Sequence, residues 1–171
     1  FIADAMLREL NADIPTVVGG VFPTYAPDIV INHPNVDYLC RGDGELPLKD
    51  LCEAMATGQD TTRIASIWAK AEDQVYRNLI GPAIAMEDLP FPDWSIFEEQ
   101  SLFRPMQGRV YKTMGIETQR GCPYKCTFCN SPSNITLYRD QQAGSFYRKK
   151  SVRRVAEELA FMQKNYGPEF I

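Results

Sequence analysis

The residues of this sequence best suited to chemistry are three cysteines in one short segment. Cys122, Cys126 and Cys129 have the spacing C-x3-C-x2-C, and Gly121 and Pro123 lie among them. Thiolates this close together must wrap around one centre, and a loop containing glycine and proline can point all three inward where a helix could not. Iron–sulfur clusters are held by cysteine thiolates, normally four. Three ligands on a four-iron cube leave one iron free to chelate a small molecule.

Zinc is the main alternative occupant of such a segment. Its fourth ligand would have to be Cys40, Cys52 or His33, whereas structural zinc sites usually show paired C-x2-C motifs. The five cysteines are odd in number, and three of them lie within eight residues. This pattern favours metal or cluster ligation in a reducing compartment over disulfides, so we expect a cytoplasmic protein.

The elements that precede the cysteines alternate between strand and helix patterns. The sequence predicts, in order, the tail of a helix at 1–10, a buried strand at 14–18 ending at Gly19-Gly20, a short helix at 27–32, a strand at 36–39 and a helix at 45–56 closed by Gly58. Alternation of this kind with short connections is typical of an α/β fold with a parallel sheet.

The pattern changes in the middle of the chain. Residues 64–70 and 74–78 predict a β-hairpin, and the four prolines that follow, at 82, 90, 92 and 105, predict an extended linker. Residues 110–118 then predict a strand that leads into the cysteine segment, with a polar stretch after it. Ser151 is a predicted N-cap for a helix whose apolar face is Val152, Val155, Leu159, Met162 and Tyr166. Gly167 should end that helix, and residues 170–171 should begin the next strand.

Charge is distributed unevenly along the chain. The net charge is −4, but residues 1–60 hold 3 Lys or Arg against 10 Asp or Glu, and residues 111–171 hold 10 against 5. Two segments with different electrostatic roles are therefore expected. The acidic total argues against nucleic-acid binding, and the apolar runs are too short to span a membrane. We expect a solvated helix start for the basic run Arg148, Lys149, Lys150, Arg153 and Arg154.

The segment ETQRGCPYKCTFCN, residues 117–130, resembles the cluster loop of radical S-adenosylmethionine (SAM) enzymes. Cys122, Cys126 and Cys129 match the three cluster ligands, and Phe128 matches an aromatic residue beside the cluster and SAM. The resemblance implies a [4Fe–4S] cluster whose open iron binds SAM, and whose reduction cleaves SAM to methionine and a 5′-deoxyadenosyl radical. It also implies an external electron donor of the flavodoxin or ferredoxin type.

Residues 17–51 are similar to the second half of the cobalamin-binding domain that precedes the barrel in one radical SAM subgroup, which includes methyltransferases and the anaerobic cyclase of bacteriochlorophyll synthesis. In that domain a glycine pair lets the backbone approach the nucleotide tail of cobalamin, a role that Gly19 and Gly20 match. Phe22 departs from the His or Pro that the subgroup usually has nearby. The motif D-x-H-x-x-G would lie before residue 1, so we expect cobalamin in a longer parent protein rather than in this chain alone.

These features together predict an α/β fold with three parts. Residues 1–58 would end a Rossmann-like (flavodoxin-like) cobalamin-binding domain, 59–109 would form a hairpin and proline-rich linker, and 110–171 would begin a partial (β/α) radical SAM barrel with its cluster loop at 120–130. We expect a fragment of a cobalamin-dependent radical SAM enzyme, inactive by itself, whose parent performs methyl transfer or cyclisation on a small-molecule or cofactor-precursor substrate.

Two other functions stay open at this point. A radical SAM methylthiotransferase would carry a further cysteine trio in its N-terminal domain, where this chain has only Cys40 and Cys52. A non-enzymatic zinc-binding module would use the same three cysteines without SAM chemistry. Metal analysis would separate the zinc module from both enzymes.

Overall fold

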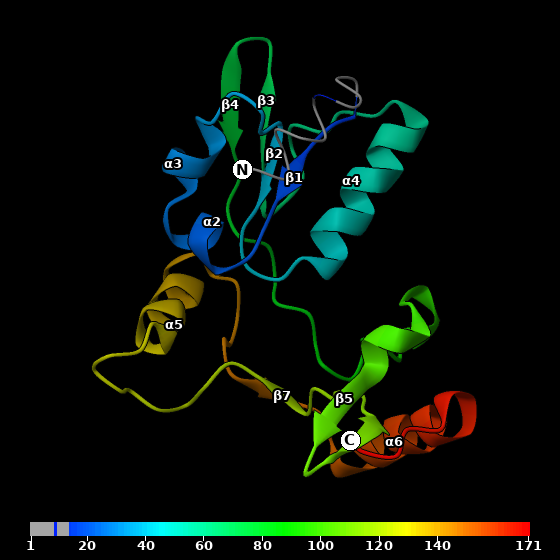
Figure 1. Ribbon diagram of the computed structural model, residues 1–171. Helices are drawn as coiled ribbons and strands as arrows, with labels where there is room; N and C mark the ends of the chain where they lie inside the picture. The colour runs from blue at the N-terminus through cyan, green and yellow to red at the C-terminus, as the bar shows by residue number, and fades with distance from the viewer. Residues whose placement is uncertain (1–8, 10–13) are drawn as a thin grey trace. The chain divides into compact units, whose positions relative to one another are not determined.

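The computed structural model describes residue 9 and residues 14–171, which form two compact units (Figure 1). The first unit comprises the described residues up to 84 together with 132–145, and the second comprises 85–131 together with 146–171. The helix predicted over 1–10 lies outside the described residues except for Glu9. None of the helices in the described part of the chain combines the length and apolar character needed to cross a bilayer.

The first unit is built on a four-stranded sheet in the order β1-β2-β3-β4. Strands β1 (Val17–Val18) and β2 (Tyr38–Cys40) are parallel, with Val17 opposite Tyr38. The hairpin of β3 (Ile67–Ala71) and β4 (Gln74–Arg77) continues the sheet antiparallel to β2. Its two turn residues, Glu72 and Asp73, both have positive φ, as a type I′ turn requires. The predicted hairpin is therefore confirmed, as an extension of the α/β sheet.

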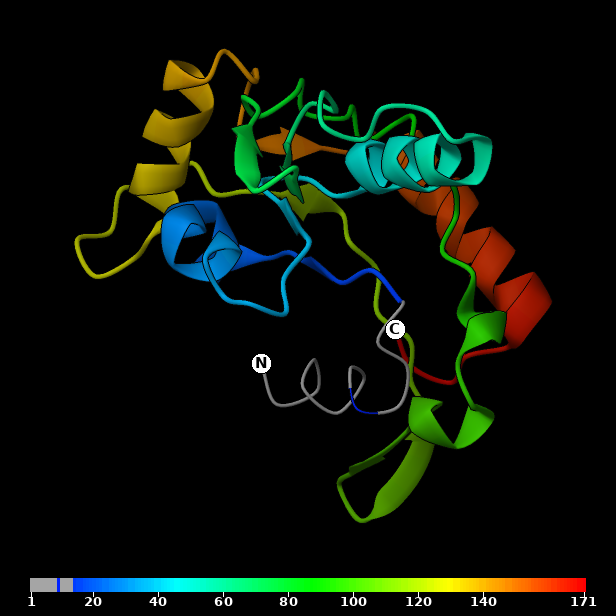
Figure 2. The same cartoon turned by 90° about the horizontal axis from the view of Figure 1, so that it is seen from above.

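Helices cover both faces of this sheet (Figures 1 and 2). On one face Leu39 and Trp68 form a buried cluster with Val30, Ile31 and Val36 around α2 (Val21–Tyr25) and α3 (Pro27–Ile31). On the other face Cys40 and Ile67 pack with Leu51 of α4 (Glu45–Thr57). Neighbours in β2 and β3 thus point to opposite faces, as the two-residue period of a strand requires.

In the first unit one predicted element ends where expected and another is shorter than expected. Helix α4 ends where the sequence predicts, at Gly58 in the left-handed conformation with φ 66°. The strand predicted as buried over 14–18 is shorter, since β1 covers only its last two residues, and Val17 is 43% exposed. It lies at the edge of the described sheet and pairs there with β2 alone.

Helix α5 (Ser131–Asp140) was not predicted, because its stretch is mainly polar. Tyr138 is its buried residue, and the Tyr138 hydroxyl lies 3.4 Å from Asp43 Oδ1 within the first unit. The turn that follows is also fixed there: Gln141 Oε1 accepts a hydrogen bond from Ile80 N, and Ala143 O accepts one from Ala83 N. Long-range contacts rather than local apolar periodicity therefore hold this helix.

The second unit contains an unexpected hairpin where one continuous strand was predicted. Residues 109–112 form β6 (Arg109–Lys112) and pair with β5 (Phe103–Met106) around Gln107 and Gly108, both at positive φ. The predicted strand over 110–118 is therefore wrong as a single element. A separate short strand, β7 (Gln119–Arg120), pairs antiparallel with β8 (Arg148–Lys149). The favourable two-residue turn explains why the first part of the segment pairs locally.

Helix α6 (Val152–Tyr166) follows the predicted pattern at both ends. The Ser151 hydroxyl accepts a hydrogen bond from Arg154 N, and Gly167 is left-handed with φ 58°. Met162 packs in a buried cluster with Leu102 and Met114. Val152, predicted on the same apolar face, is instead 88% exposed in the first turn. After the helix, Phe170 forms an isolated parallel bridge with Thr113, at the place where the sequence predicts the start of a strand.

The proline-rich segment 85–94 lies along α6 in the second unit. The Glu87 carboxylate accepts a hydrogen bond from Ser151 N at the start of the helix. Arg154 donates to Leu89 O and stacks over the Phe91 ring, with its guanidinium carbon 4.1 Å from the ring centroid. Short 3₁₀ turns at Trp94–Ile96 and Glu99–Leu102 follow it. The segment is thus extended as predicted and is bound by specific contacts.

Candidate functional site

The cysteine loop, residues 120–130, leaves β7 at a position that only glycine can occupy. Gly121 has φ 83°, and a Cβ there would lie 2.3 Å from Phe146 O and 3.0 Å from Tyr147 Cα. Real Cβ atoms do not approach a carbonyl oxygen that closely, and the left-handed conformation is itself costly for other residues. The local sequence therefore sets how the chain enters the cysteine loop.

The three predicted cluster ligands all lie in this loop as free thiols. Cys122 is half-buried, whereas Cys126 and Cys129 are exposed. A turn links the last two, because Cys129 N donates a hydrogen bond to Cys126 O at 3.2 Å. Within the described residues, no three cysteine, histidine, aspartate or glutamate side chains gather closely enough to hold a metal ion. The assignment of these cysteines as ligands stays a prediction.

The sulfur of Cys129 lies beside hydrogen-bonding groups of Ser131. The Ser131 side chain lies 3.4 Å from Cys129 Sγ, and Ser131 N donates a hydrogen bond to the same sulfur at 3.4 Å. These two bonds, the side-chain one foremost, lower the pKa of Cys129 below its ordinary value. A thiolate is the form that binds iron or zinc, so the local structure favours the ligand form of this residue.

Phe128 projects from the loop between two of these cysteines in the sequence. It is 93% exposed. A single exposed apolar side chain is common on protein surfaces and does not by itself mark a binding site. Its predicted place beside SAM and the cluster is not tested by any contact within the described residues.

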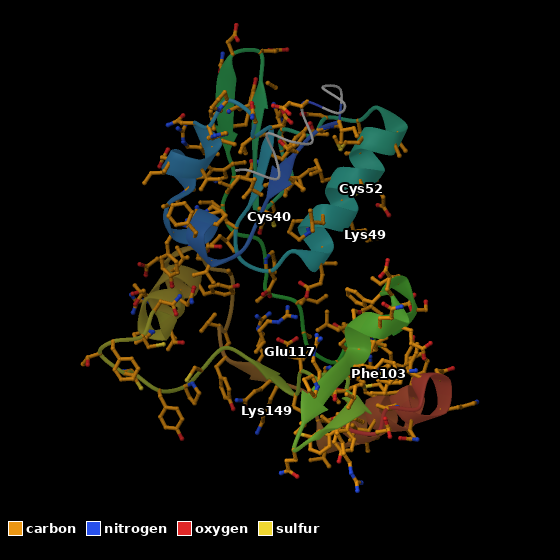
Figure 3. The ribbon with its side chains drawn as sticks, in the orientation of Figure 1. Cys40, Lys49, Cys52, Phe103, Glu117 and Lys149 are labelled. Carbon is orange, nitrogen blue, oxygen red and sulfur yellow. The ribbon has the colours of Figure 1, made fainter. Side chains whose placement is uncertain are left out.

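The two remaining cysteines belong to the first unit and have different environments (Figure 3). Cys40 of β2 is buried, and burial raises its pKa to about 11, with smaller contributions from Glu45 and Asp43. Cys52 is exposed on α4. The raised pKa keeps the Cys40 thiol protonated at neutral pH, as expected of a buried cysteine that packs as a small apolar residue.

The predicted cobalamin residues Gly19 and Gly20 line a pocket at the carboxyl ends of the two parallel strands. This glycine pocket has a volume of about 230 Å³ and is lined by Val17, Gly19, Gly20, Cys40, Gly42, Gly44 and Leu48. Ligands of open α/β sheets bind at this edge, outside the carboxyl ends of parallel strands. Gly19 and Gly20 follow β1, and Gly42 and Gly44 follow β2, so the loops after the two parallel strands meet at this pocket.

Gly42 and Gly44 also line this pocket, although the sequence predicts a cofactor-binding role only for Gly19 and Gly20. In the sequence, Arg41-Gly42-Asp43-Gly44 comes directly after the strand predicted at 36–39, and this position indicates a loop at the carboxyl end of that strand. At Gly42, with φ 75°, a Cβ would lie 3.1 Å from Ile80 Cγ2 and 3.2 Å from the Tyr138 hydroxyl. His33, in contrast, lies half-buried just beyond the end of α3 and away from the lining residues, where its Nδ1 accepts a hydrogen bond from Asn35 N.

Comparison with known proteins finds relatives over nearly the whole length of this chain. An uncharacterized methyltransferase of Pyrococcus horikoshii is 30% identical over 167 residues, which are 94% of this chain and 33% of that protein. The anaerobic magnesium-protoporphyrin IX monomethyl ester cyclase of Rubrivivax gelatinosus is 31% identical over 95% of this chain and 28% of its own length. The solved structure of OxsB, a cobalamin-dependent SAM radical enzyme, superposes with a TM-score of 0.65 at 26% identity. In sequence and fold the chain is therefore homologous to part of cobalamin-dependent radical SAM methyltransferases and cyclases.

The likeness extends over nearly the whole chain but over a minor part of each relative. OxsB is matched over 95% of this chain and 21% of its own. The radical SAM methyltransferase TsrM of Kitasatospora setae shares the fold, with a TM-score of 0.57 at 20% identity. No family model matches the chain. The chain therefore spans about a third or less of the length of the relatives and solved structures that it matches.

Proposed function

We propose that this chain is one segment of a longer cobalamin-dependent radical SAM enzyme, and that it joins the end of a Rossmann-like cobalamin domain to the first part of the catalytic barrel. The observation that carries the proposal is the cysteine loop, in which three free thiols lie between the Gly121 turn and Ser131. Homology to methyltransferases and cyclases over more than nine-tenths of the chain supports it.

The donor set of the cysteine loop fits a [4Fe–4S] cluster in its chemistry. Cys122, Cys126 and Cys129 would hold three of the irons, and the lowered pKa of Cys129 favours the thiolate that ligation needs. When bound, the cluster and SAM supply the reductive cleavage that yields methionine and a 5′-deoxyadenosyl radical. Phe128, whose ring is exposed in this chain, would then cover the SAM side of the cluster and keep water from it.

The glycine pocket fits the nucleotide tail of cobalamin. Gly19 and Gly20 present backbone rather than side chains, and at Gly20 a Cβ would meet no atom within 4 Å, so open space lies beside it. A large ligand can approach such a backbone closely. The OxsB structure that superposes on this chain was solved with aqua-cobalamin and SAM bound, which supports the same assignment here.

The order of elements after the cysteine loop supports the start of a (β/α) barrel. Thr113 precedes the loop, α6 follows it, and Phe170 returns parallel to Thr113. Phe170 N donates to Lys112 O, and Met114 N donates to Phe170 O, which is the bonding expected where a parallel pair begins. We propose these residues as the first and second barrel strands, with α6 as the crossover helix.

The reaction we propose for the full-length protein is methyl transfer or cyclisation on a small-molecule or cofactor-precursor substrate. Relatives named as methyltransferases and as cyclases both match, so the two reactions share this segment. The electron that the cluster requires would come from an external flavodoxin or ferredoxin, and the protein would act in the cytoplasm. The segment contributes cluster binding and the cobalamin pocket rather than substrate choice.

Anaerobic reconstitution of the full-length protein with iron and sulfide tests the proposal. We expect about four irons and four sulfides per chain, a brown colour, and 5′-deoxyadenosine after addition of SAM and dithionite. A variant with Ala at 122, 126 and 129 should lose all three, while the exposed-thiol control Cys52→Ala should retain them. A colourless protein that holds one zinc and forms no 5′-deoxyadenosine would refute the enzyme and leave the zinc-binding module.

A further inference from the structure

The buried hydroxyl of Thr24 connects the two loops that line the glycine pocket. Thr24 Oγ1 donates a hydrogen bond to Gly20 O at 2.7 Å and accepts one from Gly42 N at 3.2 Å. The residue is 5% exposed. Both glycines line the pocket, one after β1 and the other after β2. A single side-chain oxygen thus bridges backbone atoms on the two sides of the pocket.

One hydrogen bond of the Thr24 hydroxyl is local and the other is long-range. A threonine hydroxyl within a helical turn commonly donates to the carbonyl four residues earlier, and the bond to Gly20 O is of this local kind. The bond from Gly42 N spans 18 residues and has no such local explanation. It requires Thr24 to offer an acceptor at that point, which an apolar residue of the same shape would not do.

Further contacts hold the loop after β2 to the same residue. Arg41 donates to Thr24 O from Nε at 3.4 Å and from Nη2 at 3.3 Å, and its guanidinium lies over the Trp68 ring. On its other side Gly42 faces Tyr138, whose hydroxyl would be 3.2 Å from a Cβ at that position. The loop after β2 is therefore held between Thr24 and Tyr138 of α5. Loss of the contact with Thr24 would free the side of this loop that lines the glycine pocket.

We propose that Thr24 is a positioning residue that sets the separation of the two glycine loops, and so the opening through which the pocket admits its ligand. This inference rests on the proposed cobalamin site and deepens it. Thr24 is not among the residues that line the pocket, and it acts through Gly20 and Gly42. Without the hydroxyl, Gly42 N would lose its partner at the place where the ligand must approach.

Two substitutions separate the hydroxyl from the shape of the side chain. Thr24→Val keeps the volume and removes both hydrogen bonds, whereas Thr24→Ser keeps both bonds. Thr57→Val is a matched control, because among the described residues Thr57 Oγ1 bonds only to Glu53 O and Ala54 O, both in its own helix α4. If the hydroxyl is what matters, only Thr24→Val should disturb the pocket.

The first measurement is hydrogen exchange at the Gly42 amide in this chain, which needs no cofactor. We expect exchange to be about tenfold faster in Thr24→Val, with Thr24→Ser and Thr57→Val within about twofold of the wild type. Unchanged exchange in Thr24→Val would overturn the inference. Equal acceleration in Thr24→Ser would also overturn it, because the effect would then come from shape and not from the hydroxyl.

The second measurement is titration of the full-length protein with hydroxocobalamin, followed by its absorbance. We expect the Kd of Thr24→Val to rise about tenfold and that of Thr24→Ser by no more than about twofold. Failure of the wild type to bind would refute the proposed cobalamin site, while the Gly42 exchange would still decide the role of Thr24. Wild-type binding with unaltered affinity in Thr24→Val would refute the inference and leave the cobalamin site standing.

Discussion

Lys150 Nζ lies 2.5 Å from Glu158 Oε2, and the two side chains are 4% and 0% exposed. The backbone of Lys150 also donates to Thr118 O, next to the strand that leads into the cysteine loop. The ion pair therefore ties the end of β8 to the middle of α6 inside the second unit. Removal of either side chain would leave the other charge buried without water or a counter-ion, which is strongly destabilising.

Removal of one partner should be far more damaging than removal of both. Glu158→Ala leaves a buried ammonium, and we expect it to lower the free energy of unfolding by about 3–5 kcal/mol. The double variant with Lys150→Met and Glu158→Leu replaces the pair with apolar groups of similar size and should recover most of that loss. Urea unfolding followed by circular dichroism measures both.

An exposed pair on the same helix provides the control. Arg153 Nε lies 3.1 Å from Glu157 Oε1, with side chains 87% and 47% exposed. Pairs of this kind contribute little, so Glu157→Ala should change the free energy of unfolding by no more than about 0.5 kcal/mol. Similar losses in Glu157→Ala and Glu158→Ala, or no recovery in the double variant, would contradict this account of the buried pair.

Local signals predicted the parts of the fold that depend on few residues. Ser151 and Gly167 bound α6 as expected, and Gly58 ends α4, because caps act through their own backbone neighbours. Lys150 shows the limit of this reasoning. It belongs to a basic run that predicts a solvated helix start, yet it is buried by a partner on the next helix. Only tertiary packing could reveal that exception.

The candidate site also has one part that local sequence predicts and one part that depends on long-range pairing. The cysteine spacing is contained in eight residues and was readable without a fold. Gly42 and Gly44 line the pocket because parallel pairing places the end of β2 beside the end of β1, which local sequence does not reveal. Helix α5 was missed because its support comes from Asp43 and from residues 80–83, far away in sequence. Long-range partners, rather than propensity, decide such elements.

Arg154 should prove to be the residue that holds the proline-rich segment to α6. Its guanidinium donates to Leu89 O and stacks on Phe91, so Arg154→Ala loses a charged hydrogen bond and a cation–π contact. Together these are expected to cost about 1–3 kcal/mol. Hydrogen exchange over residues 87–91 should accelerate in this variant. The neighbouring exposed residue gives the control, and equal acceleration in Arg153→Ala would count against a specific role for Arg154.

Cys40 should make the stability of the chain depend on pH in the alkaline range. Burial raises its pKa to about 11 in the folded chain, from an ordinary value of 9.0. Between these values the folded state keeps a proton that the unfolded state loses, so the free energy of unfolding falls as pH rises, by up to about 1.4 kcal/mol per unit. Below about pH 9 this contribution is fully present.

Comparison of the wild type with Cys40→Ala separates the contribution of Cys40 to the pH dependence of stability from that of other groups that titrate in the same range. Cys40→Ala removes the thiol, so the difference in unfolding free energy between wild type and variant should shrink as pH rises from 9 to 11. The exposed thiol of Cys52 should also react with iodoacetamide at pH 8 far faster than Cys40. A difference that stays constant across this range, or equal alkylation rates, would show that Cys40 ionises normally.

Gly121 should tolerate no side chain, because two separate costs coincide there. Its φ of 83° disfavours any L-residue, and a Cβ would lie 2.3 Å from Phe146 O, so β7 and the chain before β8 would have to separate. We expect Gly121→Ala to lower the free energy of unfolding by at least about 2 kcal/mol, measured by urea unfolding. Gly115→Ala is the matched control: it has no atom within 4 Å of the added Cβ and should change stability by less than about 0.5 kcal/mol. If the two alanine variants are equally stable, the chain can enter the cysteine loop by another backbone path, and the close approach to Phe146 does not constrain it.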